Sequence, residues 1–318
     1  MILILSEVSD EMTDIVCQWL FFKNEKFLRI NNEDFYQFKV QVETDNDVFE
    51  ILIYNRDSII KLSEFEKVWF RRGNFYFLKN NSSLYSNPKI QDKIAKHIND
   101  EEKTLVDFMY SVLMQKPHIN NPMHYNSNKL ISLNIASKNG FKLPTTLITN
   151  SKEQLLCFQN TQKSIITKNI QDVLTIRNID GFSVSQSTRK IKDSIKDEFW
   201  YSLFQEEIVK KYELRILYFM GKCYTMAIFP RKETLDFRTV DVNSSECLRM
   251  VPFKLPSEII IKIKKFMKEM NLESGSIDMI VDIEDHYYFL EVNPVGQFHF
   301  LNKICNYYIE KEIYNFLK

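Results

Sequence analysis

Two apolar runs near the C-terminus contain side chains that suit a divalent cation. Asp278 lies in the run 275–281, and Glu291 and Asn293 lie in the run 287–293. Both runs are short and rich in β-branched or aromatic residues, which predicts the two strands of a hairpin. Carboxylate and amide oxygens are the ligands that hard cations prefer. The residue types therefore favour metal-assisted chemistry on this hairpin.

The turn of the hairpin decides which of these side chains meet. With a turn centred on residues 284–285, Asp278 lies directly opposite Glu291, and the two-residue period puts Glu291 and Asn293 on one face. Facing side chains on paired strands have Cβ atoms about 5 Å apart, so two carboxylates there repel each other. A Mg²⁺ ion would relieve this repulsion, and Mg²⁺ commonly accompanies phosphates. Nucleotide-dependent chemistry is the leading hypothesis, and a hairpin with a solvated acidic face is the alternative.

Two lysines could supply positive charge for a phosphate. Lys168 ends an apolar strand predicted over 164–168, and Lys129 begins a helix predicted over 128–137. An ammonium group binds phosphate as a point charge, and helix N-termini favour anions. For Lys168 the alternative is an ordinary solvated charge at the end of a strand.

Further charged or amide side chains stand at the ends of strands predicted over 202–209, 214–219 and 223–229. They are Gln205, Glu206, Glu207, Glu213, Arg215 and, after the last strand, Arg231. Charged groups at the ends of otherwise apolar strands predict a polar crevice in an apolar sheet. The alternative is the protection of edge strands by charge.

Composition limits the other classes of function. The chain has 318 residues, with 42 Lys plus Arg against 42 Asp plus Glu, which is enough for about two domains. A neutral chain gives no electrostatic reason to expect nucleic acid as a partner. The five cysteines are scattered without a Cys-x-x-Cys pair, so zinc and a disulfide framework are poorly supported.

The chain also lacks the marks of export. The N-terminus has no basic leader followed by a small-residue cleavage site. No apolar run approaches the ~20 residues that a membrane-spanning helix requires. We therefore expect a cytoplasmic protein.

Periodicity predicts an α/β N-terminal region. A strand over 2–5, a helix over 10–22 and a strand over 26–30 follow one another. Further strands are predicted over 49–54 and 67–70. A helix over 101–114, with acidic residues in its first turn, ends at a boundary over 116–122. Beyond this boundary the pattern predicts a polar hairpin over 169–189 and helices over 258–270 and 306–317.

These charged and amide residues occur along the chain in the order seen in ATP-grasp ligases. The residues that carry this resemblance, from about residue 117 to the end, are Lys129, Lys168, Gln205, Glu206, Glu213, Arg215, Arg231, Asp278, Glu291 and Asn293. The whole chain is similar to one branch, the ATP-grasp peptide maturases of graspetide (microviridin-like) biosynthesis, and most similar to the grasp-with-SPASM type. The segments that carry the closer match are 69–73, 204–206, 227–229 and 290–298.

The resemblance implies a fold and a division of the chain. The expected fold class is α/β (α+β), an ATP-grasp fold with an N-terminal Rossmann-like pre-ATP-grasp domain. The expected domains are an N-terminal α/β domain over 1–116, a central ATP-grasp lid domain over 117–200 and a C-terminal ATP-grasp domain over 201–318.

The resemblance also implies roles for individual residues, with ATP and Mg²⁺ as substrate and cofactor. Lys129 and Lys168 would contact the phosphates. Adenine would be held at Gln205 and Glu206 and by the backbone of Glu207 and Ile208, and the ribose would meet Glu213. The Mg²⁺ ligands would be Asp278, Glu291 and Asn293. Arg215 and Arg231 would face the γ-phosphate or an acyl phosphate, and Arg72 would lie near the substrate carboxylate.

One departure from the family concerns the flap that covers the phosphates. Many ATP-grasp enzymes have a Gly-rich flap, whereas the segment after Lys168 contains only Gly181. Ser183, Ser185 and Ser187 are the candidates to replace its contacts.

The implied activity is peptide macrocyclisation. An Asp or Glu side chain of a ribosomally made precursor peptide would be phosphorylated and joined to a Thr or Ser hydroxyl (ω-ester) or a Lys amine (ω-amide). The leader of the precursor would dock near residues 170–190, and relatives imply a homodimer. Two alternatives stay open: another ATP-grasp carboxylate–amine ligase, such as a glutamate ligase or a small-peptide synthetase, and a non-catalytic nucleotide-binding module.

Overall fold

The computed structural model describes the chain apart from residues 35, 44–47, 56–57, 78–86, 125–127, 172–174, 180–181, 186–187, 192–196 and 230–247. The chain divides into two compact units. Unit 1 comprises Met1–Tyr125 and Tyr308–Lys318, and unit 2 comprises Asn126–Tyr307. The three-domain division at residues 116 and 200 stays a prediction.

Unit 1 contains a four-stranded parallel sheet in the order β2-β1-β6-β7. Its strands are β1 (Ile2–Ser6), β2 (Phe27–Asn31), β6 (Lys67–Phe70) and β7 (His118–Ile119). The apolar run of β1 is buried along its whole length, as expected for a central parallel strand. Helix α1 (Glu11–Phe22) connects β1 to β2, which confirms the predicted strand–helix–strand start.

A buried ion pair joins the start of α1 to the end of β6. The Asp10 carboxylate accepts hydrogen bonds from Thr13 N–H at 3.2 Å and Thr13 Oγ1 at 2.6 Å, and so caps the helix. It also accepts from Arg71 Nε at 3.0 Å and Arg71 Nη2 at 3.2 Å. Burial alone would raise the pKa of Asp10, but its bonds and the charge of Arg71 lower it. Neighbouring Arg72 pairs with Glu7 at 2.8 Å.

The helix predicted over 101–114 begins much earlier. Helix α2 runs over Pro88–Leu113, with Pro in its first turn and the Asn87 side chain accepting from Lys89 N–H at 3.0 Å. The acidic residues at 100–102 therefore lie within the helix and not in its first turn. The cap and the N-terminal proline, both recognised start signals, outweighed the acidic cluster.

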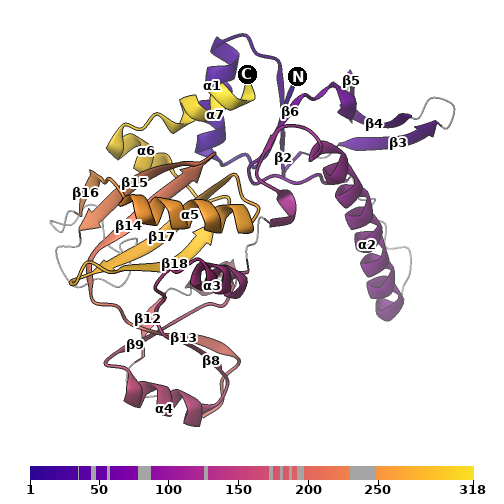
Figure 1. Cartoon of the computed structure of the whole chain (residues 1–318). Helices are drawn as coiled ribbons and strands as arrows, with labels where there is room; N and C mark the ends of the chain where they lie inside the picture. Colours follow the sequence, from indigo (N-terminus) through magenta and orange to yellow (C-terminus); the bar gives the residue numbers. More distant parts are fainter. Residues whose placement is uncertain are drawn as a thin grey trace. The chain divides into compact units, whose positions relative to one another are not determined.

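The remaining elements of unit 1 are shorter. A three-stranded antiparallel sheet holds β3 (Gln37–Glu43), β4 (Val48–Asn55) and β5 (Ser58–Lys61). The 3₁₀ helices η1 (Leu62–Glu64) and η2 (Pro122–His124) follow β5 and β7, and α7 (Ile309–Leu317) packs against α1 (Figure 1).

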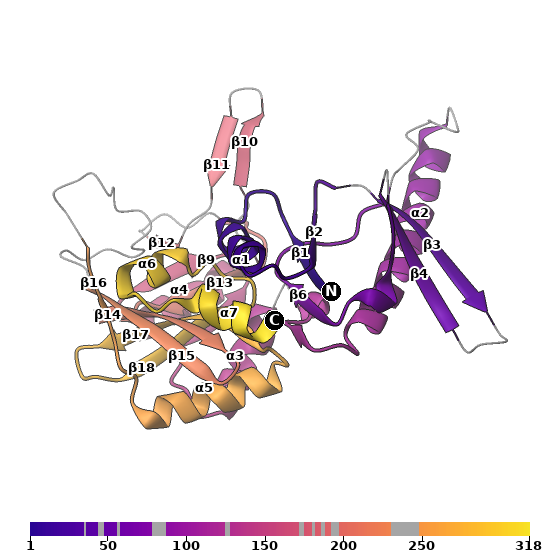
Figure 2. The ribbon, with the colours of Figure 1, turned by 90° about the horizontal axis from the view of Figure 1, so that it is seen from above.

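Unit 2 contains a five-stranded antiparallel sheet in the order β16-β15-β14-β17-β18. Its strands are β14 (Lys210–Phe219), β15 (Lys222–Phe229), β16 (Arg249–Pro252), β17 (Ser274–Asp282) and β18 (Tyr287–Asn293). Helices α3 (Lys129–Lys138) and α5 (Ser257–Glu269) contribute to the core on one face of this sheet (Figure 2). Alternate residues of β14 and β17 also belong to that core, including Leu214, Ile216, Ile277 and Met279.

A second, four-stranded sheet in unit 2 has the order β12-β9-β13-β8. It holds β8 (Thr146–Thr149), β9 (Ile165–Lys168), β12 (Arg189–Lys190) and β13 (Ser202–Glu206), and α4 (Lys152–Thr161) packs on β8. Strands β10 (Thr175–Ile179) and β11 (Phe182–Ser185) form a separate antiparallel hairpin. This confirms the hairpin predicted over 169–189.

The final helix predicted over 306–317 is confirmed as α7, which begins at Ile309, and a helix that was not predicted, α6 (His299–Cys305), precedes it. Asn306 and Tyr308 between them have φ values of 53° and 54°. A left-handed residue ends a helix because it redirects the chain. Helix α4 was not predicted at all, since Lys152–Thr161 has a mostly polar sequence.

The described residues also bear on export and oxidation. None of the described helices has the length and apolar character to cross a bilayer. Cys17, Cys157, Cys223 and Cys305 are free thiols, and Cys247 lies outside the described residues.

Candidate active site

The face of the five-stranded sheet that turns away from its apolar core carries charged residues. In β14, Leu214 and Ile216 enter the core, so Glu213 and Arg215 project from the opposite face. Arg215 lies directly opposite Asp278 of β17. Residues opposite each other on paired strands share a face, so Asp278 joins this charged face.

A β-bulge in β18 brings Glu291 opposite Asp278. Near the turn, Val281 pairs with Tyr287 and Met279 with Phe289, a register that would put Leu290 opposite Asp278. The register then shifts by one residue, and Asp278 pairs with Glu291. The predicted opposition is confirmed, but the predicted turn centre is wrong: the extra residue, Leu290, produces the opposition.

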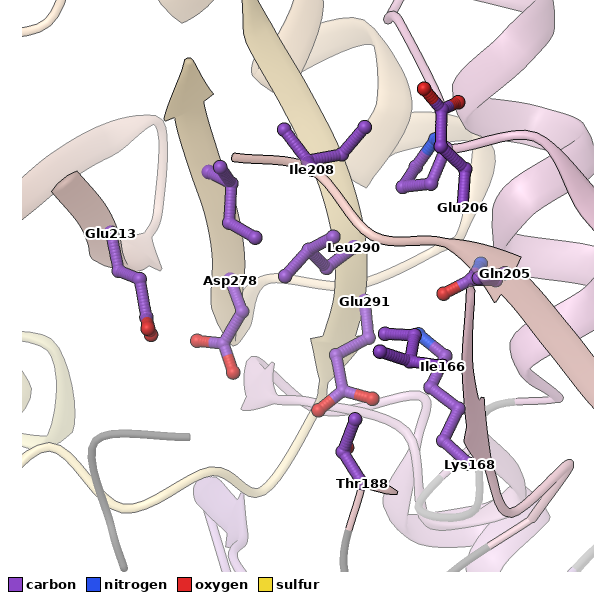
Figure 3. Close-up of a pocket in the computed structure, with 12 residues that line it drawn as sticks. Ile166, Lys168, Thr188, Gln205, Glu206, Ile208, Glu213, Asp278, Leu290 and Glu291 are labelled. Carbon is purple, nitrogen blue, oxygen red and sulfur yellow. The ribbon is translucent and has the colours of Figure 1, made fainter. Parts of the chain in front are cut away.

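This face borders a pocket in unit 2 that the four-stranded sheet also lines (Figure 3). The pocket has about 680 Å³ of space between its atoms, a volume that includes open solvent. It is lined by Pro144, Ile166, Lys168, Thr188, Gln205, Glu206, Ile208, Glu213, Asp278, Ile280, Leu290 and Glu291. Seven of the predicted site residues therefore share one pocket: Lys168, Gln205, Glu206, Ile208, Glu213, Asp278 and Glu291.

The two facing carboxylates are balanced by cations. Arg215 Nη1 donates to Asp278 Oδ1, and the two side chains are 12% and 15% exposed. Lys129 Nζ lies 3.5 Å from Glu291 Oε2 and also donates to Gln171 O at 2.9 Å. Asn128 caps α3 by accepting from Leu130 and Ile131 N–H, which fixes the start of the helix that carries Lys129.

Lys168 faces the same carboxylates from the four-stranded sheet. It pairs with Leu203 at the end of β9 and lines the pocket. Burial lowers the pKa of Lys168, Glu291 and Asp278 act to raise it, and Lys129 lowers it further. Lys168 is only partly exposed and lies at the pocket near two carboxylates, which favours an anion-binding lysine over a solvated surface charge.

The last two residues of β13 use their side chains for contacts with the neighbouring residues 145 and 146. Gln205 is buried, and its Nε2 donates to Thr146 Oγ1 at 2.9 Å. The Glu206 carboxylate accepts from Thr145 N–H at 3.3 Å and Thr145 Oγ1 at 3.0 Å, and it points away from the carboxylates of the pocket (Figure 3). Contacts of these two residues with a ligand would therefore involve the backbone or the aliphatic stem.

Glu207 is similarly engaged. Its carboxylate accepts from Ser164 Oγ at 2.6 Å and pairs with Lys190 Nζ at 2.7 Å. The next residue, Ile208, lines the pocket, and its N–H has no hydrogen-bond partner within the part of the chain that the structure describes. This short segment therefore offers backbone polarity at the pocket wall.

The donor set fits a hard cation at two of the three predicted ligands. Asp278 and Glu291 stand directly opposite each other and carry carboxylate oxygens, the type of ligand that Mg²⁺ takes from proteins. Asn293 lies one step further, opposite Ser276, and is exposed. Its Oδ1 accepts from Val295 N–H at 3.1 Å and so caps the turn that follows β18.

A second group of ligand-type atoms belongs to the hairpin turn. Atoms of Asp282, Glu284 and His286 lie within 4.8 Å of one another. The Asp282 carboxylate accepts from Glu284 N–H at 2.9 Å and His286 N–H at 2.8 Å, and these backbone bonds lower its pKa against the effect of burial. Such bonds are those of an Asx turn, which accounts for the cluster.

Several predicted residues fall elsewhere. Arg231, Gly181 and Ser187 lie outside the described residues, and Ser183 and Ser185 lie in β11. Arg72 belongs to unit 1.

Sequence reasoning missed the pocket residues Pro144, Ile166, Thr188, Ile280 and Leu290. It also missed Lys210, whose Nζ donates to Glu213. The apolar members could have been found from the alternation along β9 and β17, whereas Leu290 depends on a bulge that no local pattern marks.

The chain was compared with known families and structures. No protein-family model matches it, and no curated protein sequence matches it. A RiPP-associated ATP-grasp ligase from Chryseobacterium gregarium, in complex with ADP and a leader and core peptide, is similar at a TM-score of 0.81 and 24% identity, over 99% of this chain and 96% of that one.

Two further structures extend the comparison. The macrocyclase MdnC from Microcystis aeruginosa MRC, bound with precursor peptide MdnA, has a TM-score of 0.76 and 23% identity, over 100% of this chain and 99% of that one. D-alanine–D-alanine ligase from Bacillus anthracis, complexed with ATP, has a TM-score of 0.53 and 12% identity, over 99% and 94%. The chain thus has the ATP-grasp fold, in the α+β form shared by RiPP-associated ATP-grasp ligases.

Proposed function

We propose that the chain is an ATP-dependent ligase that closes rings in a ribosomally made peptide, a graspetide (microviridin-like) maturase of the grasp-with-SPASM type. The observation that carries the proposal is the pocket in which Asp278 and Glu291 of one sheet and Lys168 of the other line a single space. This arrangement suits a nucleotide whose phosphates are neutralised by lysine and by a cation.

ATP is the substrate assigned to this pocket. Lys168 and Lys129 contact its phosphates, and Glu213 meets the ribose. The adenine lies beside Gln205 and Glu206 and bonds to the backbone of Glu207 and Ile208, where the Ile208 N–H supports the assignment. Apolar Ile166, Ile280 and Leu290 supply the walls that a flat base requires.

Asp278 and Glu291 hold Mg²⁺, with Asn293 as the third ligand once its side chain leaves the turn. A bound Mg²⁺ supplies charge neutralisation on the phosphates. Asp278 and Glu291 fix where that charge stands, because the hairpin and its bulge hold them opposite each other.

The reaction has two steps. A carboxylate oxygen of an Asp or Glu side chain attacks the γ-phosphorus of ATP, the bond to the β-phosphate oxygen breaks, and ADP leaves. A Thr or Ser hydroxyl, or a Lys amine, then attacks the carbonyl carbon of the acyl phosphate. Phosphate leaves and the nucleophile loses its proton, giving an ω-ester or an ω-amide. Arg215 and Arg231 neutralise the phosphoryl charge, and Arg72 binds the substrate carboxylate.

The assigned partner is a precursor peptide with a leader and an acidic core. Its support is the pair of similar structures that contain such peptides. The leader docks at residues 170–190, which include the β10–β11 hairpin. A homodimer in the cytoplasm, where precursors are synthesised, completes the proposal, and light scattering would give the mass in solution.

Another ATP-grasp carboxylate–amine ligase is the second candidate, because D-alanine–D-alanine ligase shares the fold. It predicts ADP release with free amino acids or small peptides. A non-catalytic nucleotide-binding module predicts no ADP release with any acceptor.

The test is co-expression with the small acidic peptide encoded next to the gene, followed by mass spectrometry. Each ring should appear as the loss of one water. Purified protein should release ADP with this peptide and not with free amino acids. A matched pair of variants, Glu291→Gln in the pocket and Glu284→Gln on the exposed turn of the same hairpin, should be inactive and active respectively. An unmodified peptide together with ADP release from amino acids would overturn the proposal.

A further inference from the structure

A second β-bulge lies beside the pocket, in β14. Lys210 pairs with Asp282, and Tyr212 pairs with Val281, so Lys211 is an extra residue in β14. Without this bulge Lys211 would stand opposite Asp282. The bulge therefore changes the face to which the start of β14 directs its side chains.

The register places Lys210 on the charged face of the sheet. In β17, Asp278, Ile280 and Asp282 share that face by the two-residue period. Lys210 stands opposite Asp282, and Glu213 stands opposite Ile280. Lys210 and Glu213 are an odd number of positions apart and would point to opposite faces in a regular strand. The bulge allows them to meet.

The contact between them is direct and shielded from solvent. Lys210 Nζ donates to Glu213 Oε1, and the side chains are only 11% and 17% exposed. Glu213 lines the pocket, whereas Lys210 is not among the residues that line it. Lys210 thus holds the carboxylate from outside the pocket. The other lysine of the pair, Lys211, reaches Asp285 at 2.8 Å, with side chains 47% and 62% exposed.

We propose that Lys210 is a positioning residue that fixes the Glu213 carboxylate for the ribose hydroxyls of the nucleotide, and so makes the pocket selective for ribonucleotides. The inference rests on the proposed function, because it takes Glu213 as the ribose contact. A glutamate has several rotamers and gains selectivity only when one of them is held. An ion pair that is shielded from solvent supplies this constraint better than an exposed one.

Calorimetry of nucleotide binding tests the proposal without turnover. The probes are ADP, 2′-deoxy-ADP and 3′-deoxy-ADP, each with Mg²⁺, on the full chain. The parent protein should bind ADP about tenfold more tightly than at least one deoxy analogue, the scale of a hydrogen bond to a charged group. Lys210→Met should lose this preference because ADP binds more weakly, whereas the deoxy analogue that binds weakly to the parent protein should keep its parental affinity. Lys210→Arg should restore part of the preference.

Three controls make the result decisive. Lys211→Met removes the neighbouring exposed lysine and should leave the preference intact. Glu213→Gln should lose the preference by itself, and Lys210→Met added to it should cause no further loss. Lys210→Gln is a second variant in case Lys210→Met melts below the assay temperature.

The outcomes separate the inference from the proposed function. A parent protein that binds none of the three nucleotides would contradict the proposed function. A parent protein that prefers ADP, with the same preference in folded Lys210→Met and Lys210→Gln, would overturn the role of Lys210 alone. Loss of the preference in Lys211→Met to the same degree would also overturn it, since a general loss of positive charge would then be the cause.

Discussion

Two of the Arg–Asp ion pairs in the described residues differ in their surroundings. In unit 1, Arg71 and Asp10 are 3% and 0% exposed, and the carboxylate accepts further bonds from Thr13. In unit 2, Arg215 and Asp278 are 12% and 15% exposed at the pocket, and a second carboxylate, Glu291, stands directly opposite Asp278. The first pair closes a helix end against a strand, and the second lies where an incoming cation can compete for the carboxylate. An ion pair that supports the fold is buried, and its carboxylate oxygens accept further hydrogen bonds. An ion pair that is available for chemistry is partly exposed and keeps room for another ligand on its carboxylate.

The largest effect is expected at the two facing carboxylates of the pocket, Asp278 and Glu291. Asp278→Asn or Glu291→Gln should lower turnover roughly 100- to 1,000-fold, because the charge that balances the phosphates is misplaced. The melting temperature should stay close to that of the parent protein. ADP release with the precursor peptide measures the first effect and calorimetry the second. Parental turnover in either variant would remove Asp278 and Glu291 from the metal site.

The buried ion pair of Asp10 and Arg71 should affect folding stability and leave nucleotide binding unchanged. Asp10→Asn leaves the Arg71 guanidinium without its carboxylate and should cost about 3–5 kcal/mol of folding free energy. Urea unfolding, followed by Trp19 and Trp69 fluorescence in a Trp200→Phe background, measures the loss in unit 1. Nucleotide binding under native conditions should be unchanged.

A double variant sharpens this prediction. Asp10→Asn combined with Arg71→Met should be less destabilised than the sum of the single variants, because the uncompensated charge is gone. Strict additivity would show that the two side chains do not act as a pair.

Lys168 should have a smaller effect than the metal carboxylates. Lys168→Met removes an ammonium group that lines the pocket and is only partly exposed, and we expect the KM for ATP to rise about tenfold. Lys265→Met, at an exposed position of α5, is the matched control and should leave KM unchanged. An unchanged KM in Lys168→Met at saturating precursor would return Lys168 to the class of surface lysines.

The smallest effect concerns the unfolding free energy at low pH. The pKa of Asp10 in the folded chain lies below its ordinary value of 3.8. The unfolded state therefore takes up the proton first as the pH falls, so the stabilising contribution is complete above that value and is lost as the pH falls through the folded pKa. Between about pH 5 and pH 2, unfolding free energy should fall more steeply in the parent protein than in Asp10→Asn. Parallel slopes would contradict the lowered pKa.

The sequence predicted most of the elements that carry the pocket. The strands β9, β14 and β15, the helices α3 and α5 and the strand–helix–strand start all follow from local periodicity, whereas the Asp278–Glu291 opposition was predicted from a turn centre that proved wrong. The errors have local causes too. Helix α2 starts at Pro88 because an Asn cap and a proline outweigh an acidic cluster, and the final helix starts at Ile309 and not at residue 306 because Asn306 and Tyr308 are left-handed.

The sequence alone determined the order and type of the charged residues. The two-residue alternation along a strand also determined which face of the sheet carries Asp278, Glu213 and Arg215. What only the tertiary structure decided is the partner of each charge. The bulge at Leu290 sets Glu291 against Asp278, the bulge at Lys211 sets Lys210 against Glu213, and Thr145 draws the Glu206 carboxylate away from the pocket. The alternation of side chains between the two faces is a local property of one strand. The position of a bulge depends on how two strands pair, and that pairing depends on packing across the whole sheet.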